Sequence, residues 1–366
     1  MTINLETACS YTAAGYQALS FPPVEDKSIG YQRLTFPSLE FSPLETFKSL
    51  SGRIGSIHPL IKGVVAVIFV AALIFLFAKD KIKAAVNQYA QKKYNQALGH
   101  GKHGEFKNAF RCYRIAAFLG HPFAQHDLGW CYKEGYGIEK SKEKAFQYFK
   151  LSADQGFAVA QFMVSTCYLR GYGIEKNQEK AFHYLKLSAD QGFTAAQSIL
   201  GVFYRAGYIV KQDHAEAVKY FQLAANQRDV DAQFYLAKCY QKGLGIKKNQ
   251  IQAFQYFQLA ADQGVVKAEF KLAQCYENGY GIKENPTKAF KYYKRAADRG
   301  YVKAQLEVAI CYAKGYGVEQ NPEQARNYEH LVRDQVIAGR FLMDQYQCSE
   351  VERLLQYDGS VNNGER

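Results

Sequence analysis

The sequence predicts an all-α fold, a solenoid built from stacked helix–turn–helix units. One residue pattern returns every 36 residues from Gly120 onward, and within each copy alanines and tyrosines recur at helical spacing. A glycine-rich loop also divides each copy into two helical stretches. The chain has 366 residues, 48% of them hydrophobic and 22% charged, a composition that excludes disordered and collagen-like proteins.

Residues 1–59 show no sustained hydrophobic period and are predicted to be a disordered segment. A short motif recurs there, as Leu-Ser-Phe-Pro-Pro-Val-Glu from Leu19 and as Leu-Thr-Phe-Pro-Ser-Leu-Glu from Leu34. Proline favours extended backbone before it, so an alternative interpretation is a set of docking motifs or an export signal. No secretory signal peptide is predicted at the start, because the first basic residue is Lys27.

Residues 60–79 are predicted to form a single transmembrane helix. Gly63 to Ala78 is a run of 16 residues without a polar side chain, and about 20 apolar helical residues span a bilayer. The alternative is a buried core helix, but such helices are rarely apolar on every face. Five lysines follow the run closely and three basic residues precede it, so the positive-inside rule predicts a single-pass membrane protein with a cytoplasmic repeat domain.

Six copies of the repeated unit occupy residues 120–336. The first helix of each copy carries an alanine and, eight residues later, a tyrosine, as in Ala124 and Tyr132. The loop Gly135-Tyr136-Gly137-Ile138 shows the usual connection, in which glycine supplies a left-handed helix cap. An N-cap residue then begins the second helix in every copy: Ser141, Asn177, Asp213, Asn249, Asn285 and Asn321.

The pattern A-x-x-x-L-G-x-x-Y-x-x-G-x-G-V, followed by A-x-x-Y-[YF]-x-x-A-A-x-x-G, resembles the Sel-one-like repeat family, which is related to the tetratricopeptide repeat. The resemblance covers residues 120–336 and implies a right-handed α-solenoid. Residues 84–119 resemble a degenerate tetratricopeptide-like first repeat. Residues 337–357 are predicted to be a capping helix and residues 358–366 a tail. The third copy departs from the pattern, because Ile209 stands where the loop usually has glycine.

The cysteines and histidines predict neither a metal site nor a catalytic site. Five of the eight cysteines lie at one slot of the repeat, so each has no partner in its own unit and lies beyond disulfide reach of the next. They are predicted to be small buried hydrophobic residues. His100 and His103 form the one close histidine pair, in a turn without a third ligand. No catalytic sequence motif is present, so no enzyme activity, cofactor or small-molecule substrate is predicted.

Positive charge raises the possibility of a nucleic-acid partner, since the net charge is +12. The basic residues are nevertheless spread along the repeats, and the sequence contains no recognisable nucleic-acid-binding motif. A protein or peptide partner is therefore predicted. By family resemblance, the first helices line a concave groove. A stripe of their positions varies between copies, apolar in the early copies and mostly basic in the late ones. The candidate partner-binding residues are Phe123, Trp130, Met163, Arg170, Tyr235, Lys238, Lys242, Lys267, Lys271, Lys303 and Lys314.

An alternative is that the apolar members of this stripe only pack against the preceding repeat. With the groove interpretation, the sequence predicts a membrane-anchored scaffold or adaptor that binds protein partners and contacts the lipid bilayer through residues 60–79. One alternative is a secreted effector-like protein that engages host proteins. A second is a β-lactam hydrolase-like enzyme, an activity attributed to cysteine-rich relatives whose paired cysteines this chain lacks.

Overall fold

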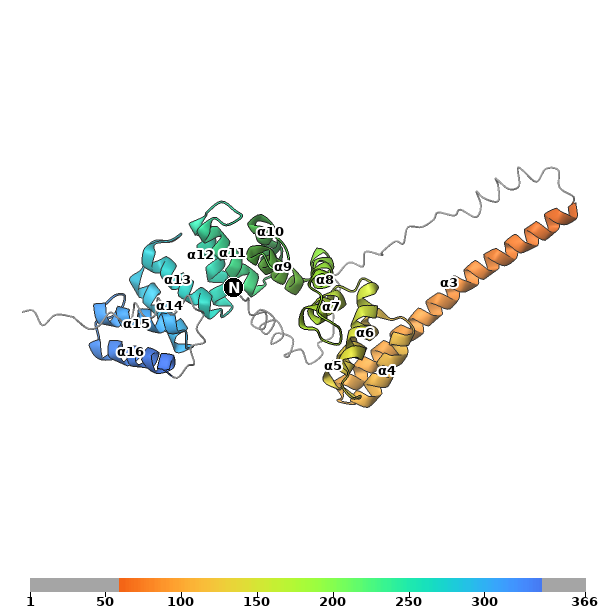
Figure 1. The fold of residues 1–366 in the computed structure, drawn as a ribbon, viewed down its shortest axis with the longest axis horizontal. Coiled ribbons are helices and arrows are strands. Elements are labelled where there is room, and N and C mark those ends of the chain that lie inside the picture. Colours follow the sequence, from red (N-terminus) through yellow and green to blue (C-terminus); the bar gives the residue numbers. More distant parts are fainter. Residues whose placement is uncertain (1–58, 338–366) are drawn as a thin grey trace, which may run out of the picture. The chain divides into compact units, whose positions relative to one another are not determined.

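In the computed structural model, the described residues are 59–337, with side chains described for residues 78–335, and they form 14 α-helices and no strand (Figure 1). The helices divide between unit 1, which ends at Asn177, and unit 2, which begins at Gln178. Unit 1 contains α3 (Pro59–Lys102), α4 (Phe106–Phe118), α5 (Pro122–Glu134), α6 (Lys142–Asp154) and α7 (Ala158–Arg170). Unit 2 contains α8 (Gln178–Asp190), α9 (Thr194–Ala206), α10 (His214–Asn226), α11 (Val230–Lys242), α12 (Gln250–Asp262), α13 (Val266–Asn278), α14 (Pro286–Asp298), α15 (Val302–Lys314) and α16 (Pro322–Ile337).

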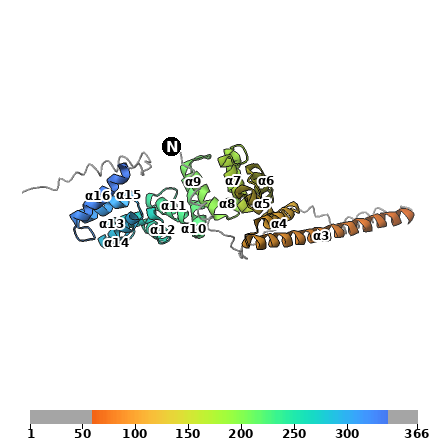
Figure 2. The ribbon, with the colours of Figure 1, turned by 90° about the horizontal axis from the view of Figure 1, so that it is seen from below.

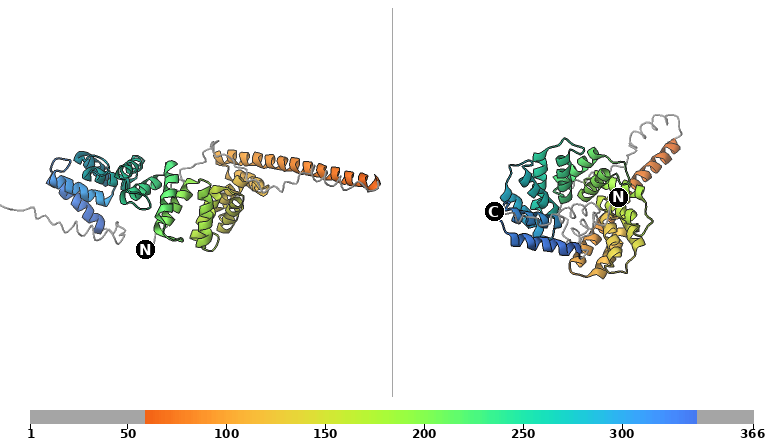
Figure 3. Two further views of the ribbon diagram at one scale, coloured as in Figure 1. Left: turned by 90° about the horizontal axis from the view of Figure 1, so that it is seen from above. Right: turned by 60° about the vertical axis from the view of Figure 1, so that its left-hand side comes forward.

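This architecture confirms the predicted all-α solenoid of helix pairs. Each of the helices from α4 to α15 has 13 residues, as a strict repeat requires. In unit 1, α4 packs along the C-terminal part of α3 (Figure 3). In unit 2, the helices from α9 to α16 follow one another in chain order (Figure 2). The predictions for residues 1–58 and 338–366, which include the capping helix and the tail, lie outside the described residues.

α3 is a single helix of 44 residues that includes the predicted span, residues 60–79. From Lys79 to Tyr89 its side chains are exposed, and this stretch includes Asp80, Lys81 and Lys83. Among the residues that the structure describes, no helix is long and apolar enough to cross a bilayer. This finding overturns the prediction of a single-pass membrane protein with a cytoplasmic repeat domain and a bilayer partner. The apolar run suggested a span when taken alone, but its helix continues as charged, solvent-exposed turns.

The helix boundaries follow from capping residues. At the start of second helices, the Ser141 hydroxyl accepts a hydrogen bond from the Lys144 N–H at 3.2 Å, and Asn285 Oδ1 accepts one from the Lys288 N–H at 2.9 Å. At the end of first helices, a glycine adopts the left-handed conformation, as Gly135 does at φ 82°. The same cap in every repeat makes the helix pairs equal in length, which lets successive pairs stack.

Small residues and tyrosine pairs fill the core. The alanine at the start of each first helix is fully buried, which lets the neighbouring helix approach closely. Within several helix pairs, the two repeated tyrosines stack: Tyr204 and Tyr220 have ring centroids 5.8 Å apart and an interplanar angle of 5°. The same stacking recurs for Tyr132 with Tyr148, Tyr240 with Tyr256, and Tyr276 with Tyr292. Much of the tyrosine content of the chain therefore serves the core.

The cysteines of the repeat slot are buried and free. Burial raises the pKa of the Cys131 and Cys167 thiols to about 12 and that of Cys275 to about 11. A thiol with so high a pKa is neutral at physiological pH and a poor nucleophile. These residues therefore act as small apolar side chains, in agreement with the prediction from their spacing.

In five of the six repeats, a buried glutamine bonds the first helix to its surroundings. Gln197 Nε2 donates to the Ala189 carbonyl at 3.1 Å, and its Oε1 accepts from Gln227 Nε2 at 2.9 Å. The fifth repeat replaces this glutamine with Glu269, whose side chain has no exposed surface. Two arginines compensate: Arg295 Nε lies 2.8 Å and an Arg299 guanidinium nitrogen 3.2 Å from Glu269 Oε1. The repeat has therefore exchanged an amide pair for a buried ionic group.

The second glycine of the loop adopts a left-handed conformation close to the neighbouring helix, which favours glycine at this position. Gly281 has φ 74°, and a methyl group there would overlap the carbonyl group of Gln250. Gly300 has a similar φ of 81° but nothing within 4 Å of the same methyl position. We expect Gly300→Ala to lower the free energy of unfolding by about 1–2 kcal/mol through left-handed strain alone. Gly281→Ala should lower it by about 1–3 kcal/mol more, because the helix α12 must shift.

Urea denaturation of the two variants measures this difference directly. Equal losses for Gly281→Ala and Gly300→Ala would show that the loop moves freely away from α12. The third repeat already carries Ile209 at this loop position, and its φ is 68°. The chain therefore keeps the left-handed conformation even where the residue is unfavourable.

Candidate functional site

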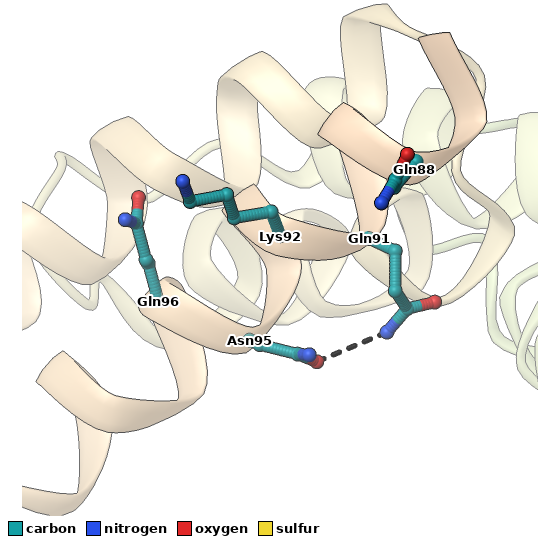
Figure 4. A pocket seen from close by; sticks show the side chains of 5 residues that line it. All are labelled: Gln88, Gln91, Lys92, Asn95 and Gln96. Atoms are coloured by element: carbon teal, nitrogen blue, oxygen red, sulfur yellow. Dashed lines mark hydrogen bonds between the residues drawn. The ribbon is translucent and has the colours of Figure 1, made fainter. Parts of the chain in front are cut away.

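A polar depression lies on the surface of α3, lined by Gln88, Gln91, Lys92, Asn95 and Gln96 (Figure 4). Gln91 Nε2 donates to Asn95 Oδ1 at 3.0 Å, and Gln91 Oε1 lies 3.0 Å from His121 Nε2. Lys92 is the one ionisable group among the lining residues. The depression therefore offers neither paired catalytic groups nor a set of metal ligands.

Within the described part of the chain, no three His, Cys, Asp or Glu side chains gather closely enough to hold a metal ion. The repeat cysteines described there are free rather than paired. The β-lactam hydrolase alternative was based on relatives whose repeats are joined by disulfides, and the described cysteines of this chain form no disulfide.

In unit 1, the apolar members of the predicted stripe pack among aromatic neighbours. The Phe123 ring meets the Phe157 ring edge-on, with centroids 4.7 Å apart, and lies 6.1 Å from the Tyr94 ring. Trp130 Nε1 donates to His126 Nε2 at 3.1 Å, and the Lys133 ammonium lies 3.8 Å from the Trp130 ring centroid. Phe123 and Trp130 both keep part of their surface exposed. The stripe in unit 1 is thus partly a packing surface.

The remaining predicted residues of unit 1 lie on α7. Met163 is half-buried in the middle of this helix, whereas Arg170 is exposed in its last turn. A basic residue in the last turn interacts favourably with the helix dipole, so Arg170 has a local role independent of any partner.

In unit 2, the predicted residues on α11 and α13 form a cationic cluster. Lys242 and Lys267 are exposed, and Lys238 and Lys271 are half-buried. The Lys271 ammonium donates to Gln274 Oε1 at 2.8 Å, and the Lys238 ammonium lies 5.6 Å from the Phe234 ring centroid. On α15, Lys303 is half-buried and Lys314 is exposed in the last turn.

Arg205 completes the cluster, although the stripe pattern did not include it. It lies in the last turn of α9, and its guanidinium carbon is 4.5 Å from the Tyr235 ring centroid on α11. Tyr235 in turn stacks on Phe221, with centroids 5.3 Å apart. Arg205 is one position before the last stripe slot of its helix. Its place in the cluster is evident only from the contact of its guanidinium with Tyr235 in the next repeat.

Lys238 lies at the electrostatic centre of the cluster. Its pKa is lowered to about 8, first by burial and then by the positive charges of Arg205, Lys242, Lys271 and Lys267. Asp231, an acidic residue of the same helix, interacts electrostatically with Lys267. We refer to Arg205, Lys238, Lys242, Lys267 and Lys271 as the basic cluster.

The family model for the Sel1 repeat matches residues 122–157, 158–193, 194–229, 230–265, 266–301 and 302–328. The chain belongs to the Sel1 repeat family, which confirms the resemblance found in the sequence. Sel1 repeat proteins typically act in protein–protein interaction and are generally non-catalytic.

Two solved structures show the same fold. A Sel1 repeat protein from Oxalobacter formigenes is 29% identical, with a TM-score of 0.56, and the match covers 66% of this chain and 99% of that one. The second is c5321, a protective antigen present in uropathogenic Escherichia coli strains displaying an SLR fold. It is 27% identical, with a TM-score of 0.64, and the match covers 76% of this chain and 62% of that one. No curated protein matches the chain.

Proposed function

We propose that this protein is a scaffold or adaptor that binds a protein partner through the first helices of its repeats. In unit 2, the partner is an extended, acidic segment that lies across α11 and α13. The observation that carries this proposal is the basic cluster, in which positively charged side chains from three first helices gather closely enough for Lys238 to feel the charges of the other four. Unbalanced charge of one sign destabilises a folded surface and attracts a partner of the opposite sign.

The cluster differs from the ordinary charges of the repeats. On second helices, lysines pair with an aspartate four residues later, as Lys294 does with Asp298 at 2.6 Å. Lys242 and Lys267 make no ion pair of this kind among the described residues. They are exposed, so they are available to an incoming segment. Tyr235, which is half-buried and stacks on the buried Phe221, offers an apolar contact on the same first helix as Lys242.

Charge reversal of the cluster tests the proposal. The double variant Lys242→Glu/Lys267→Glu should bind an extended peptide of alternating Glu and Leu about 10–100-fold more weakly than the unmodified chain, because two attractive contacts become repulsive. The matched control is Lys247→Glu/Lys248→Glu, an equal charge change on an exposed loop of the same unit. Fluorescence anisotropy at two salt concentrations measures both affinity and its screening.

The peptide in which Gln replaces Glu should bind weakly to all three proteins. Equal affinity of the Glu peptide for the cluster variant and the loop variant would contradict the proposal. So would binding that is independent of salt, because exposed charge contacts weaken as salt rises.

A further inference from the structure

The polar groups of Arg205 are incompletely used within the chain. Its guanidinium lies on the Tyr235 ring, which holds the side chain in place, yet its Nε–H is buried without an acceptor among the described residues. A buried donor without an acceptor costs about 1–3 kcal/mol and requires an explanation. An arginine on a tyrosine ring still presents its N–H groups in the guanidinium plane, where an oxyanion accepts them.

Lys238 lies close enough to Arg205 for the two positive charges to repel each other. Neither side chain makes an ion pair with a carboxylate of the described chain. The structure thus places two half-buried cations on the contacting helices α9 and α11, with Arg205 held on the Tyr235 ring one helical turn from Lys238. One carboxylate would balance only one of these charges.

We propose that Arg205 and Lys238 bind a doubly charged tetrahedral oxyanion, the phosphoryl group of a phosphorylated side chain on the partner. This inference rests on the proposed function and specifies the partner. A phosphoryl group carries close to two negative charges at neutral pH and three acceptor oxygens, so it can accept hydrogen bonds from the outer N–H groups of the Arg205 guanidinium and balance both cations. The exposed residues Lys242 and Lys267 then contact the acidic residues that flank the phosphorylated position.

The site also predicts a pH dependence with a definite sign. The titratable and charged groups around Lys238 are Arg205 on α9, Tyr235, Cys239, Lys242 and Asp231 on α11, and Lys267 and Lys271 on α13. Burial and the neighbouring positive charges lower the pKa of Lys238 to about 8, so this lysine loses its proton as the pH rises through that value. Oxyanion binding favours the protonated form, and affinity should therefore fall as the pH rises through about 8.

Sulfate is the first probe, because it keeps two negative charges across the pH range and isolates the titration of the protein. The experiment uses the full chain and follows the Arg205 Nε–H resonance by NMR, assigned with Arg205→Gln. We expect sulfate to shift this resonance and to bind at least tenfold more weakly to Lys238→Met. Affinity for the unmodified chain should fall between pH 7 and pH 9, whereas that of Lys238→Met should stay level.

The control variant is Lys291→Met, which removes one exposed lysine from a second helix of the same unit. It should match the unmodified chain in sulfate affinity and in pH profile. Thermal unfolding checks the fold of each variant, and Lys238→Met should unfold at the same or a higher temperature, because it relieves charge repulsion. Equal sulfate affinity in Lys238→Met and Lys291→Met would overturn the proposal.

A second comparison separates this proposal from the function on which it rests. A peptide with one phosphoserine in a glutamate-rich sequence should bind at least tenfold more tightly than the same peptide with serine, and Arg205→Gln should remove that advantage. If both peptides bind equally, the phosphoryl site is wrong while the acidic-partner function stands. If neither peptide binds although sulfate does, the acidic-partner function is wrong, and the assignment to a partner's phosphoryl group falls with it.

Discussion

Removal of Arg295 and Arg299 together should lower the free energy of unfolding by about 3–5 kcal/mol, because it leaves the Glu269 carboxylate buried without a cation. The variant Arg295→Leu/Arg299→Gln introduces the residues that the fourth repeat has at the same slots, Leu259 and Gln263. The large loss is therefore expected even though each new residue is one that the fold accepts elsewhere. Arg295 also donates to the Ala261 carbonyl at 3.4 Å, and this contact is lost as well.

Adding Glu269→Gln to the same variant should recover most of the stability. The triple variant restores the amide pair of the other repeats, in which Gln263 Nε2 donates to Gln233 Oε1 at 2.8 Å. Glu269→Gln alone, which leaves two arginines without their carboxylate, should also be less stable than the triple variant. Urea denaturation of the four proteins closes a thermodynamic cycle. If the effect of the arginine pair and the effect of Glu269→Gln simply add, the two arginines and Glu269 are not energetically coupled.

Phe221→Ala should lower the free energy of unfolding by about 3–5 kcal/mol, because it opens a cavity in the core of unit 2. Phe221 has no exposed surface, and its ring lies directly over Gly201 of α9. A methyl group built on Gly201 would come within 2.6 Å of this ring. Gly201→Ala should therefore also destabilise the protein, by about 1–3 kcal/mol of overpacking.

The two positions should compensate when changed together. In Gly201→Ala/Phe221→Leu, the smaller side chain makes room for the new methyl group, so the loss should be less than the sum of the two single losses. Thermal and urea unfolding of the single and double variants measure the coupling. Additive losses would indicate that helices α9 and α10 separate rather than remain in close contact.

The repeat was predictable from the sequence because short-range rules govern it. The helix starts, such as Asn249 and Asn285, are capping residues whose side chains bond within the next turn. The left-handed glycines and the buried alanines recur at fixed positions of the repeat, so each copy supports the same assignment of helices and loops. The prediction of a membrane span in residues 60–79 was wrong. The hydropathy of the apolar run suggested a span, but the helix continues beyond the run as charged, exposed turns.

The candidate site was only partly predictable. The variable stripe led to Lys238, Lys242, Lys267 and Lys271, since residues that change between copies are free of the repeat's packing. The stripe missed Arg205, whose role depends on a side chain that reaches from one repeat to the next. The stripe also joined Phe123 to the site, although much of that ring is used in packing against Phe157.

The sequence by itself determined the repeat length, the helix pairs, the caps and the family, because these depend on contacts within one unit of the chain. The tertiary structure decided which charges meet. Arg205 and Lys238 lie 33 positions apart, and only the stacking of α9 on α11 brings them close enough to repel. Coulomb repulsion and burial depend on distance in space, so periodicity could show where lysines accumulate but not which of them would lie near the half-buried Arg205.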